Sequence, residues 1–194
     1  TDRMIVTCTR NLLLQQYSLD PTTGATQLVK TWSRAGHTLP VTCMSFHLSN
    51  VFLATGSVDG TVRIWDARGA FVTHVFKPFQ GGDGGGSGRL SVTAITWKQE
   101  LGQLILAIAR DDGSLAIHDL REENPNKVII LRDHVSAVTT MDWWGHEFFV
   151  STGRDSILNL WRIVESKASD NNKKKGTKGK KTNPLVSPAM EYRR

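Results

Sequence analysis

The stretch Leu53-Ala54-Thr55-Gly56-Ser57-Val58-Asp59-Gly60-Thr61-Val62-Arg63-Ile64-Trp65-Asp66 decides the fold of this chain. Its first five residues are small or apolar, Asp59-Gly60 is a typical hairpin turn, and from Thr61 to Trp65 polar or aromatic side chains alternate with aliphatic ones. The pattern predicts two antiparallel strands joined by a tight turn. Gly36-His37 stands upstream of the stretch, and Trp65-Asp66 closes it.

The same order of features recurs along the chain. Strand-like segments surround a polar turn at Arg10-Asn11, after which a strand is expected at residues 12–19, and similar turns at Asp112-Gly113 and at Arg154-Asp155. In each copy one ring-bearing side chain follows the turn on the next strand, and these four are Tyr17, Trp65, His118 and Trp161. Their spacings are 48, 53 and 43 positions, and a glycine-rich insertion at residues 81–88 accounts for the longest one. A repeat of this length is typical of a four-stranded propeller blade.

We therefore predict an all-β fold, a partial WD-repeat β-propeller with about four blades of a larger ring, each a four-stranded antiparallel sheet. A partial first blade precedes blades at about residues 36–78, 90–131 and 133–166. Because each sheet needs neighbours on both faces, we expect a fragment of a longer propeller that does not fold stably alone. Residues 167–183 are expected to be a lysine-rich disordered insertion, and residues 184–194 could return as an outer strand.

Charge and cysteine content add two constraints. The net charge is +6, and residues 167–194 carry nine Lys or Arg against two acidic residues, so the positive charge is an appendage on a near-neutral body. Cys8 and Cys43 fall within predicted strands, which favours small core residues in a reducing compartment over a disulfide framework. No apolar run approaches the length of a membrane span.

Two sets of residues repeat with the blade period and look like catalytic machinery. Each has a histidine, a hydroxyl residue, an aspartate and a tryptophan: His37, Thr55, Asp59 and Trp65, and then His134, Ser151, Asp155 and Trp161. A hydrolase needs one exposed nucleophile in one pocket, whereas a set that recurs with the repeat is typical of a structural hydrogen-bond network. We therefore predict no catalytic residue and no metal site.

These two sets resemble the buried tetrads of WD-repeat proteins, which implies that the aspartate accepts from the histidine ring, the hydroxyl bridges onward and the indole N–H closes the chain. The third blade departs from this pattern, because Ile108 and His118 replace the hydroxyl and the tryptophan while Asp112 remains. We expect its network to be absent or altered. His118 is expected to be a packed strand residue, since no partner stands at metal-ligand spacing.

A lysine cluster is the first candidate for a contact with a partner. Six lysines occupy nine positions with Gly and Thr between them: Lys173, Lys174, Lys175, Lys178, Lys180 and Lys181. Such a run could neutralise several phosphates of a nucleic acid, although no aromatic residue is present to stack on bases. A solvated tail and a nuclear localisation signal are the alternatives, and the sequence does not separate them from RNA contact.

A second candidate is the box Trp65-Asp66-Ala67-Arg68, with an imperfect echo at His118-Asp119-Leu120-Arg121. Trp-Asp-x-Arg at the end of a blade resembles the box by which some propellers dock onto the adaptor of cullin-type ubiquitin ligases. In that alternative Trp65, Asp66 and Arg68 form the docking site. The motif is short and arises easily by chance in this fold.

The order of several local sequences indicates a narrower family. They are Thr9-Arg10-Asn11-Leu12-Leu13-Leu14, His37-Thr38-Leu39-Pro40-Val41, the stretch 53–66, His134-Val135-Ser136-Ala137-Val138-Thr139 and Ser151-Thr152-Gly153-Arg154-Asp155. Together they resemble the first propeller of the transducin beta-like family of small-subunit processome subunits, which belong to the UTP-B subcomplex. The resemblance implies a nucleolar, non-enzymatic scaffold with tandem propellers that helps to assemble the precursor of the small ribosomal subunit around its RNA.

The sequence thus predicts a non-catalytic interaction subunit of a ribonucleoprotein assembly, acting in pre-ribosomal RNA processing and ribosome biogenesis in the nucleolus. Its expected partners are other WD-repeat and assembly-factor proteins and pre-ribosomal RNA, with no cofactor, membrane or small-molecule substrate. The competing hypotheses are a substrate receptor of a cullin-type ubiquitin ligase and a generic protein-binding propeller.

Overall fold

The computed structural model describes residues 3–32, 36–77, 90–122 and 128–163 with their side chains, and the backbone of residues 186–193. The first sheet contains β1 (Arg3–Cys8), β2 (Leu14–Leu19) and β3 (Thr26–Thr31). The second contains β4 (Val41–Phe46), β5 (Phe52–Ser57), β6 (Val62–Asp66) and β7 (Phe71–Phe76). The third contains β8 (Val92–Trp97), β9 (Ile105–Arg110), β10 (Leu115–Asp119) and β11 (Ile129–Leu131). The fourth contains β12 (Val138–Trp144), β13 (Phe148–Gly153), β14 (Ile157–Ile163) and β15 (Val186–Arg193).

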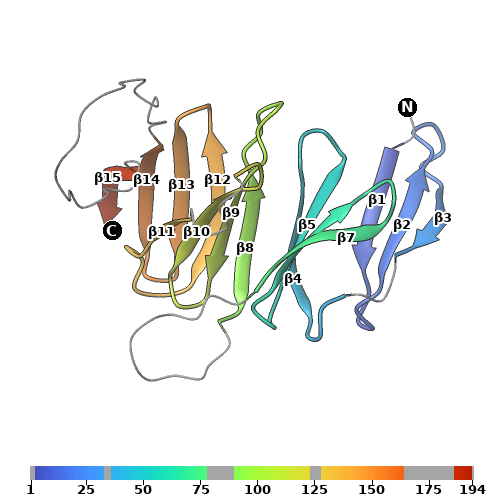
Figure 1. The fold of residues 1–194 in the computed structure, drawn as a ribbon, viewed down its shortest axis with the longest axis horizontal. Coiled ribbons are helices and arrows are strands. Elements are labelled where there is room, and N and C mark those ends of the chain that lie inside the picture. Colours follow the sequence, from blue (N-terminus) through green and yellow to red (C-terminus); the bar gives the residue numbers. More distant parts are fainter. Residues whose placement is uncertain (1–2, 33–35, 78–89, 123–127, 164–185, 194) are drawn as a thin grey trace, which may run out of the picture.

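The four sheets follow one another in a row, and each is an antiparallel meander in which strands adjacent in sequence pair (Figure 1). The first strands of neighbouring sheets contact each other, β4 with β8 and β8 with β12, as expected for inner strands of successive propeller blades. The prediction of an all-β, partial propeller with four-stranded blades is confirmed, and the first sheet has three strands in the described region. No helix long and apolar enough to cross a membrane occurs among the described residues.

Strand alternation produces a core on each side of a sheet. On β6, Val62 and Ile64 pack toward the third sheet, while Trp65 packs with Trp32 toward the first. A third core joins the third and fourth sheets and is built around Leu115, Phe149 and Trp161, among others. Each pair of neighbouring sheets therefore shares one apolar layer, so that the stack itself is the hydrophobic core.

The two cysteines are free thiols at the margins of these layers. Cys8 packs against the core between the first and second sheets, and Cys43 against the core between the second and third. Burial raises the pKa of both thiols, which keeps them in the neutral, unreactive form.

One turn conformation recurs in all four sheets: between β1 and β2 in the first sheet, and between the second and third strands in the other three. The residue after the turn Asp or Asn has a positive φ: Leu12 (61°), Gly60 (77°), Gly113 (84°) and Ser156 (63°). This corrects the sequence-based expectation that a strand begins at Leu12. The turn closes later, with the Thr9 N–H donating to the Leu13 carbonyl, and β2 begins at Leu14.

A β-bulge also recurs, on the first strand of the last three sheets. The pairing shifts between Val41 and Cys43, between Val92 and Ala94, and between Val138 and Thr140. In the second sheet the bulged residue is Thr42, whose hydroxyl is 3.1 Å from the Gly56 carbonyl and 2.6 Å from the Val92 carbonyl of the next sheet. The bulge thus aims a hydroxyl across to the neighbouring blade.

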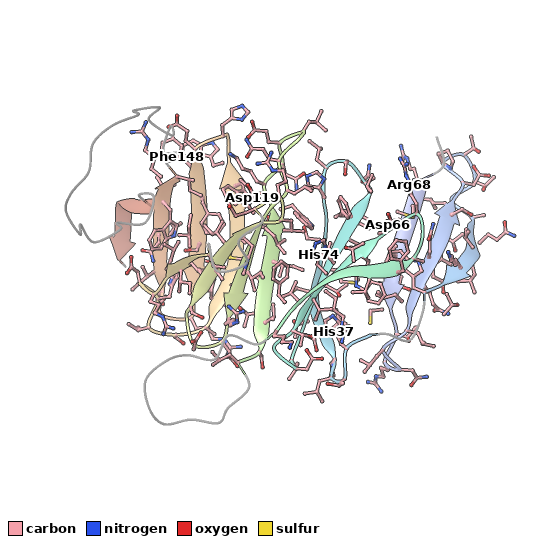
Figure 2. All side chains as sticks on the ribbon, in the orientation of Figure 1. His37, Asp66, Arg68, His74, Asp119 and Phe148 are labelled. Carbon is pink, nitrogen blue, oxygen red and sulfur yellow. The ribbon has the colours of Figure 1, made fainter. Side chains whose placement is uncertain are left out.

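The stack has two opposite edges, which Figure 2 shows through its labelled residues. His37 lies at one end of the strands, and we call this the histidine edge; it includes the β1–β2 turn and, in the other three sheets, the turns between the second and third strands. Asp66 and Arg68 lie at the other end together with Asp119 and Phe148. We call this the aspartate edge; it includes the β2–β3 turn and, in the other three sheets, the connections between the first and second strands and between the third and fourth.

Candidate functional site

The second sheet brings together the four residues of its predicted set. The Trp65 indole N–H donates to the Thr55 hydroxyl at 3.0 Å, and Thr55 Oγ1 is 2.7 Å from His37 Nε2. His37 Nδ1 is 2.9 Å from the Thr61 hydroxyl, and Thr61 in turn donates to Asp59 at 2.6 Å. His37 and Asp59 are 3.5 Å apart, so the threonine hydroxyl relays the contact that the family tetrad implies to be direct.

The groups at the two ends of this network, the Trp65 indole and the Asp59 carboxylate, set the direction of its hydrogen bonds. An indole can only donate and a carboxylate can only accept, so Thr55 accepts from Trp65 and donates to His37 Nε2. His37 is then a neutral imidazole with its proton on Nδ1, donating toward Thr61. Burial lowers the pKa of His37 and outweighs the opposing effect of Asp59, in agreement with a neutral ring.

Asp59 also holds the turn closed and anchors the chain that enters the blade. Its carboxylate accepts from the backbone N–H groups of Thr61 and Thr38, each at 2.9 Å. Burial alone would raise the pKa of Asp59, but the hydrogen bonds from Thr61 and Thr38 together hold it well below its usual range. Asp59 therefore stays ionised at neutral pH and links two segments that are distant in sequence.

The fourth sheet makes the same network without the relay. Trp161 donates to Ser151 at 3.1 Å, and Ser151 Oγ is 2.9 Å from His134 Nε2. His134 Nδ1 contacts the Asp155 carboxylate directly, at 3.0 and 3.2 Å, because Ile157 stands where the second sheet has Thr61. Burial would raise the pKa of Asp155, and hydrogen bonds from Ile157, His134 and Val135 lower it overall.

Among the described residues, the third sheet makes no such network. Ile108 and His118 occupy the places of the hydroxyl and the tryptophan, and the His118 ring packs on Phe76 of the second sheet with centroids 4.5 Å apart. Burial, reinforced by Arg110, lowers the pKa of His118 to about 4, so this ring is neutral. Asp112 still closes its turn by accepting from the Ser114 N–H and hydroxyl.

The geometry of the two networks limits the chemistry that their side chains could perform. Thr55 and Ser151 have no exposed surface, so neither hydroxyl can reach a substrate from outside. Among the residues that the structure describes, no group of three or more His, Cys, Asp or Glu side chains could hold a metal ion. The second and fourth sheets therefore each contain a structural hydrogen-bond network.

The docking box is divided between core and surface. Trp65 is buried and its N–H already donates to Thr55. The Asp66 carboxylate closes its own turn by accepting from the N–H groups of Arg68 and Gly69. Only Arg68 is exposed with its side chain available for a partner. In the third sheet the corresponding Arg121 is held by Asp119 at 3.0 Å and by the Gly102 carbonyl.

The lysine cluster lies outside the described residues, but the two ends of its segment are placed. β14 ends at Ile163 and β15 begins at Val186, and these two residues pair. Ile163 and Val186 therefore lie at the aspartate edge, where the second and third sheets have the connection between their third and fourth strands.

Three network residues are absent from the sequence-based sets: Thr61, Ser57 and Asn159. Ser57 accepts from the Asp59 N–H, and the Asn159 amide lies 3.3 Å from His134 Nε2. Thr61 carries a signal in its position two residues after Asp59, which Ser114 shares relative to Asp112. Asn159 has no such signal, because Arg63 and Ala116 stand at the corresponding positions.

Comparison with known proteins finds a family model that matches the region of the second-sheet network. The family described as "WD domain, G-beta repeat" matches residues 26–66, which span β3 of the first sheet and β4 to β6 of the second. Transducin beta-like protein 3 of Bos taurus is 31% identical over 170 residues, which is 87% of this chain and 19% of that protein. The periodic tryptophan protein 2 homolog of Caenorhabditis elegans is 26% identical over 174 residues, covering 68% of this chain and 18% of its own length.

Solved structures show the same fold. The structure of U3-55K matches with a TM-score of 0.66 and 21% identity, over 82% of this chain and 45% of that one. The WD40 repeats of RRP9 give the same TM-score and identity over 44% of their chain. The chain spans about a fifth of the length of the curated relatives it matches, at 19% and 18%.

Proposed function

Because this chain is a WD-repeat β-propeller protein similar to transducin beta-like protein 3, we propose that it is a non-catalytic scaffold subunit of a ribosome-biogenesis assembly, and specifically of the small-subunit processome. The observation that carries the proposal is the 31% identity over 170 residues, which is 87% of the chain. In the cell the protein is expected in the nucleolus, bound to other WD-repeat proteins and assembly factors.

The geometry of the sheets supports a scaffold. The complete networks use their polar side chains internally, on hydroxyls with no exposed surface, so they stiffen the blades. The turns at the two edges remain as the surfaces on which partners could bind, as is general for rigid repeat folds.

The lysine-rich segment is the proposed RNA contact. Its ends at Ile163 and Val186 lie at the aspartate edge, so Lys173 to Lys181 would extend from that edge. Six ammonium groups on a segment of this composition can follow a phosphate backbone without reading its sequence. The exposed Arg68 lies at the same edge in the second sheet (Figure 2).

Depletion of the protein from cells tests the proposed function. We expect precursor ribosomal RNA to accumulate and mature small-subunit RNA to fall, while large-subunit RNA is largely maintained, as measured by hybridisation with probes for each. Re-expression of the wild-type protein should restore processing. Normal levels of small-subunit RNA after full depletion would contradict the proposal.

The RNA contact has a separate test. Replacement of the six lysines by glutamine should weaken binding to a single-stranded pre-ribosomal RNA fragment and lower the slope of log affinity against log salt by up to about 4, at roughly 0.7 for each phosphate contact. Unchanged affinity and slope, together with loss of nuclear import, would assign the cluster to localisation instead.

A further inference from the structure

The turn between β6 and β7 of the second sheet, residues 67–70, brings an aromatic ring and two cations together at the aspartate edge. Phe71 follows the turn and is 53% exposed. Arg68 lies within the turn and is exposed (Figure 2). Lys30 of β3 reaches the same turn from the first sheet, and its ammonium donates to the Gly69 carbonyl at 3.0 Å. We call the side chains of Lys30, Arg68 and Phe71 the aromatic–basic patch.

The backbone of this turn holds the ring in place. Gly69 carries no side chain, and a Cβ there would overlap the Cδ1 and Cε1 atoms of the Phe71 ring. The Asp66 carboxylate closes the turn by accepting from the N–H groups of Arg68 and Gly69, at 2.9 and 2.7 Å. The ring therefore lies against a closed turn, so that little conformational freedom is lost when a partner covers its exposed part.

The charges of the aromatic–basic patch favour an anionic partner. Lys30 and Arg68 are both exposed, and the Arg68 guanidinium has no partner among the residues that the structure describes. The neighbouring Asp66 carboxylate already accepts two backbone hydrogen bonds. In the third sheet the corresponding Arg121 is bound by Asp119, so its guanidinium is engaged within its own blade. In the second sheet, two exposed cations thus stand beside one hydrogen-bonded carboxylate.

We propose that the aromatic–basic patch binds single-stranded RNA, with one base stacked on Phe71 and the adjacent phosphates bound by Lys30 and Arg68. An aromatic ring between cationic side chains binds single strands without reading their sequence, because every base has a flat face and every nucleotide a phosphate. The lysine cluster offers ammonium groups but no ring for a base, so the patch supplies the contact that the cluster lacks. The inference rests on the proposed function, since it names a second RNA contact of the same scaffold at the same edge.

Fluorescence anisotropy with a labelled 12-nucleotide single-stranded RNA tests the proposal, on full-length protein in which the six lysines of the cluster are replaced by glutamine. This background removes the contact of the lysine cluster, so that the measured affinity reports on the rest of the protein. Phe71→Leu keeps an apolar side chain but removes the ring, and we expect a loss of at least about fivefold in affinity. Phe71→Trp offers a larger ring and should bind at least as tightly as the background protein.

The two cations are tested in the same assay. Lys30→Gln and Arg68→Gln should each weaken binding and lower the slope of log affinity against log salt by roughly 0.7. Arg10→Gln is the matched control, because Arg10 is an exposed arginine in the β1–β2 turn at the opposite, histidine edge, and it should bind like the background protein. An abasic strand of the same length should bind more weakly than the RNA, and Phe71→Leu should not weaken its binding further.

The proposal is overturned if Phe71→Leu binds the RNA as tightly as its background, or if that background does not bind RNA. Losses in Lys30→Gln and Arg68→Gln without a loss in Phe71→Leu would indicate a general site for anions, such as an acidic protein segment, and would likewise overturn it. None of these results bears on the depletion experiment, so failure of this contact is distinguishable from failure of the proposed function.

Discussion

Trp65 supplies the second sheet with a donor that a purely apolar ring would lack. Its N–H donates to Thr55, and its ring packs on Trp32 with centroids 5.6 Å apart. Trp65→Phe removes the donor, breaks the directed chain that ends at Asp59 and leaves space beside Trp32. We expect a loss of about 1–3 kcal/mol in the free energy of unfolding, measured by urea denaturation.

Phe71→Leu is the control for that change, because Phe71 is 53% exposed on β7 of the second sheet and has no role in a network. It should alter stability by no more than about 0.5 kcal/mol. Equal losses for the two variants would show that the cost of Trp65→Phe does not arise from its buried hydrogen-bond network.

The protonation of His118 makes the free energy of unfolding depend on pH. Its pKa is lowered to about 4 in the folded state, mainly by burial, whereas an unfolded histidine titrates near 6.5. The unfolded chain therefore takes up a proton first, and stability falls as the pH drops from about 6.5 toward 4. His37, whose pKa is also lowered by burial, contributes in the same direction.

His118→Phe keeps a ring against Phe76 but cannot be protonated. We expect it to reduce the loss of stability between pH 7 and pH 4.5 by about 1–2 kcal/mol, measured by denaturation at each pH. Phe76→Leu retains His118 and should keep the wild-type pH dependence. If stability depended on pH in the same way in His118→Phe as in the wild type, the His118 ring would be accessible to protons in the folded state.

At the scale of the strand, Gly56 lets two sheets approach closely. A Cβ at this position would lie 2.5 Å from Val92 Cγ1 and 2.7 Å from the Cys43 sulfur. Gly56→Ala should therefore cost about 1–3 kcal/mol through overpacking. The double variant Gly56→Ala with Val92→Ala should lose less than the sum of the two single variants, in a denaturant-based double-mutant cycle. Additive losses would place the strain within the second sheet.

The strands and turns also show how much of the fold could be predicted from the sequence. The Asp-Gly turns, the period-two alternation and the spacing of Trp65 and Trp161 were sufficient for the fold, because each reports a local preference. The relay through Thr61 could not be foreseen, because it depends on how Asp59 is rotated in the folded turn. The start of β2 was placed too early, because an apolar residue such as Leu12 gives no sign of a positive φ.

The pocket between the third and fourth sheets, which is lined by Lys98, Glu100 and Arg162 among others, could not be predicted from the sequence for a different physical reason. It results from two turns that are about forty residues apart and differ in length, so no single motif contains it. Lys98 alternates with the apolar residues of β8 as a solvent-facing residue would, yet it is buried by the next sheet. Only the stacking of the sheets gives these residues a common site.

At the scale of the molecule, the described sheets leave apolar side chains uncovered at both ends of the stack. Leu28 and Val29 are 49% and 58% exposed on the first sheet, and Leu158 and Trp144 are 37% and 67% exposed on the fourth. We expect residues 1–194 alone to unfold over a broad, weakly cooperative range, since each sheet depends on its neighbours. Calorimetry of this segment and of the full-length protein in one buffer provides the comparison, and a sharp transition for the segment would contradict the expectation.

We propose that this propeller serves a ribonucleoprotein assembly. Affinity purification of the full-length protein from cells is the first measurement to make. Bound RNA would be sequenced and bound proteins identified in the same sample. The account predicts pre-ribosomal RNA together with other WD-repeat assembly factors. Recovery of a cullin and its adaptor without RNA would contradict it and would make the exposed Arg68 beside Asp66 the first position to mutate.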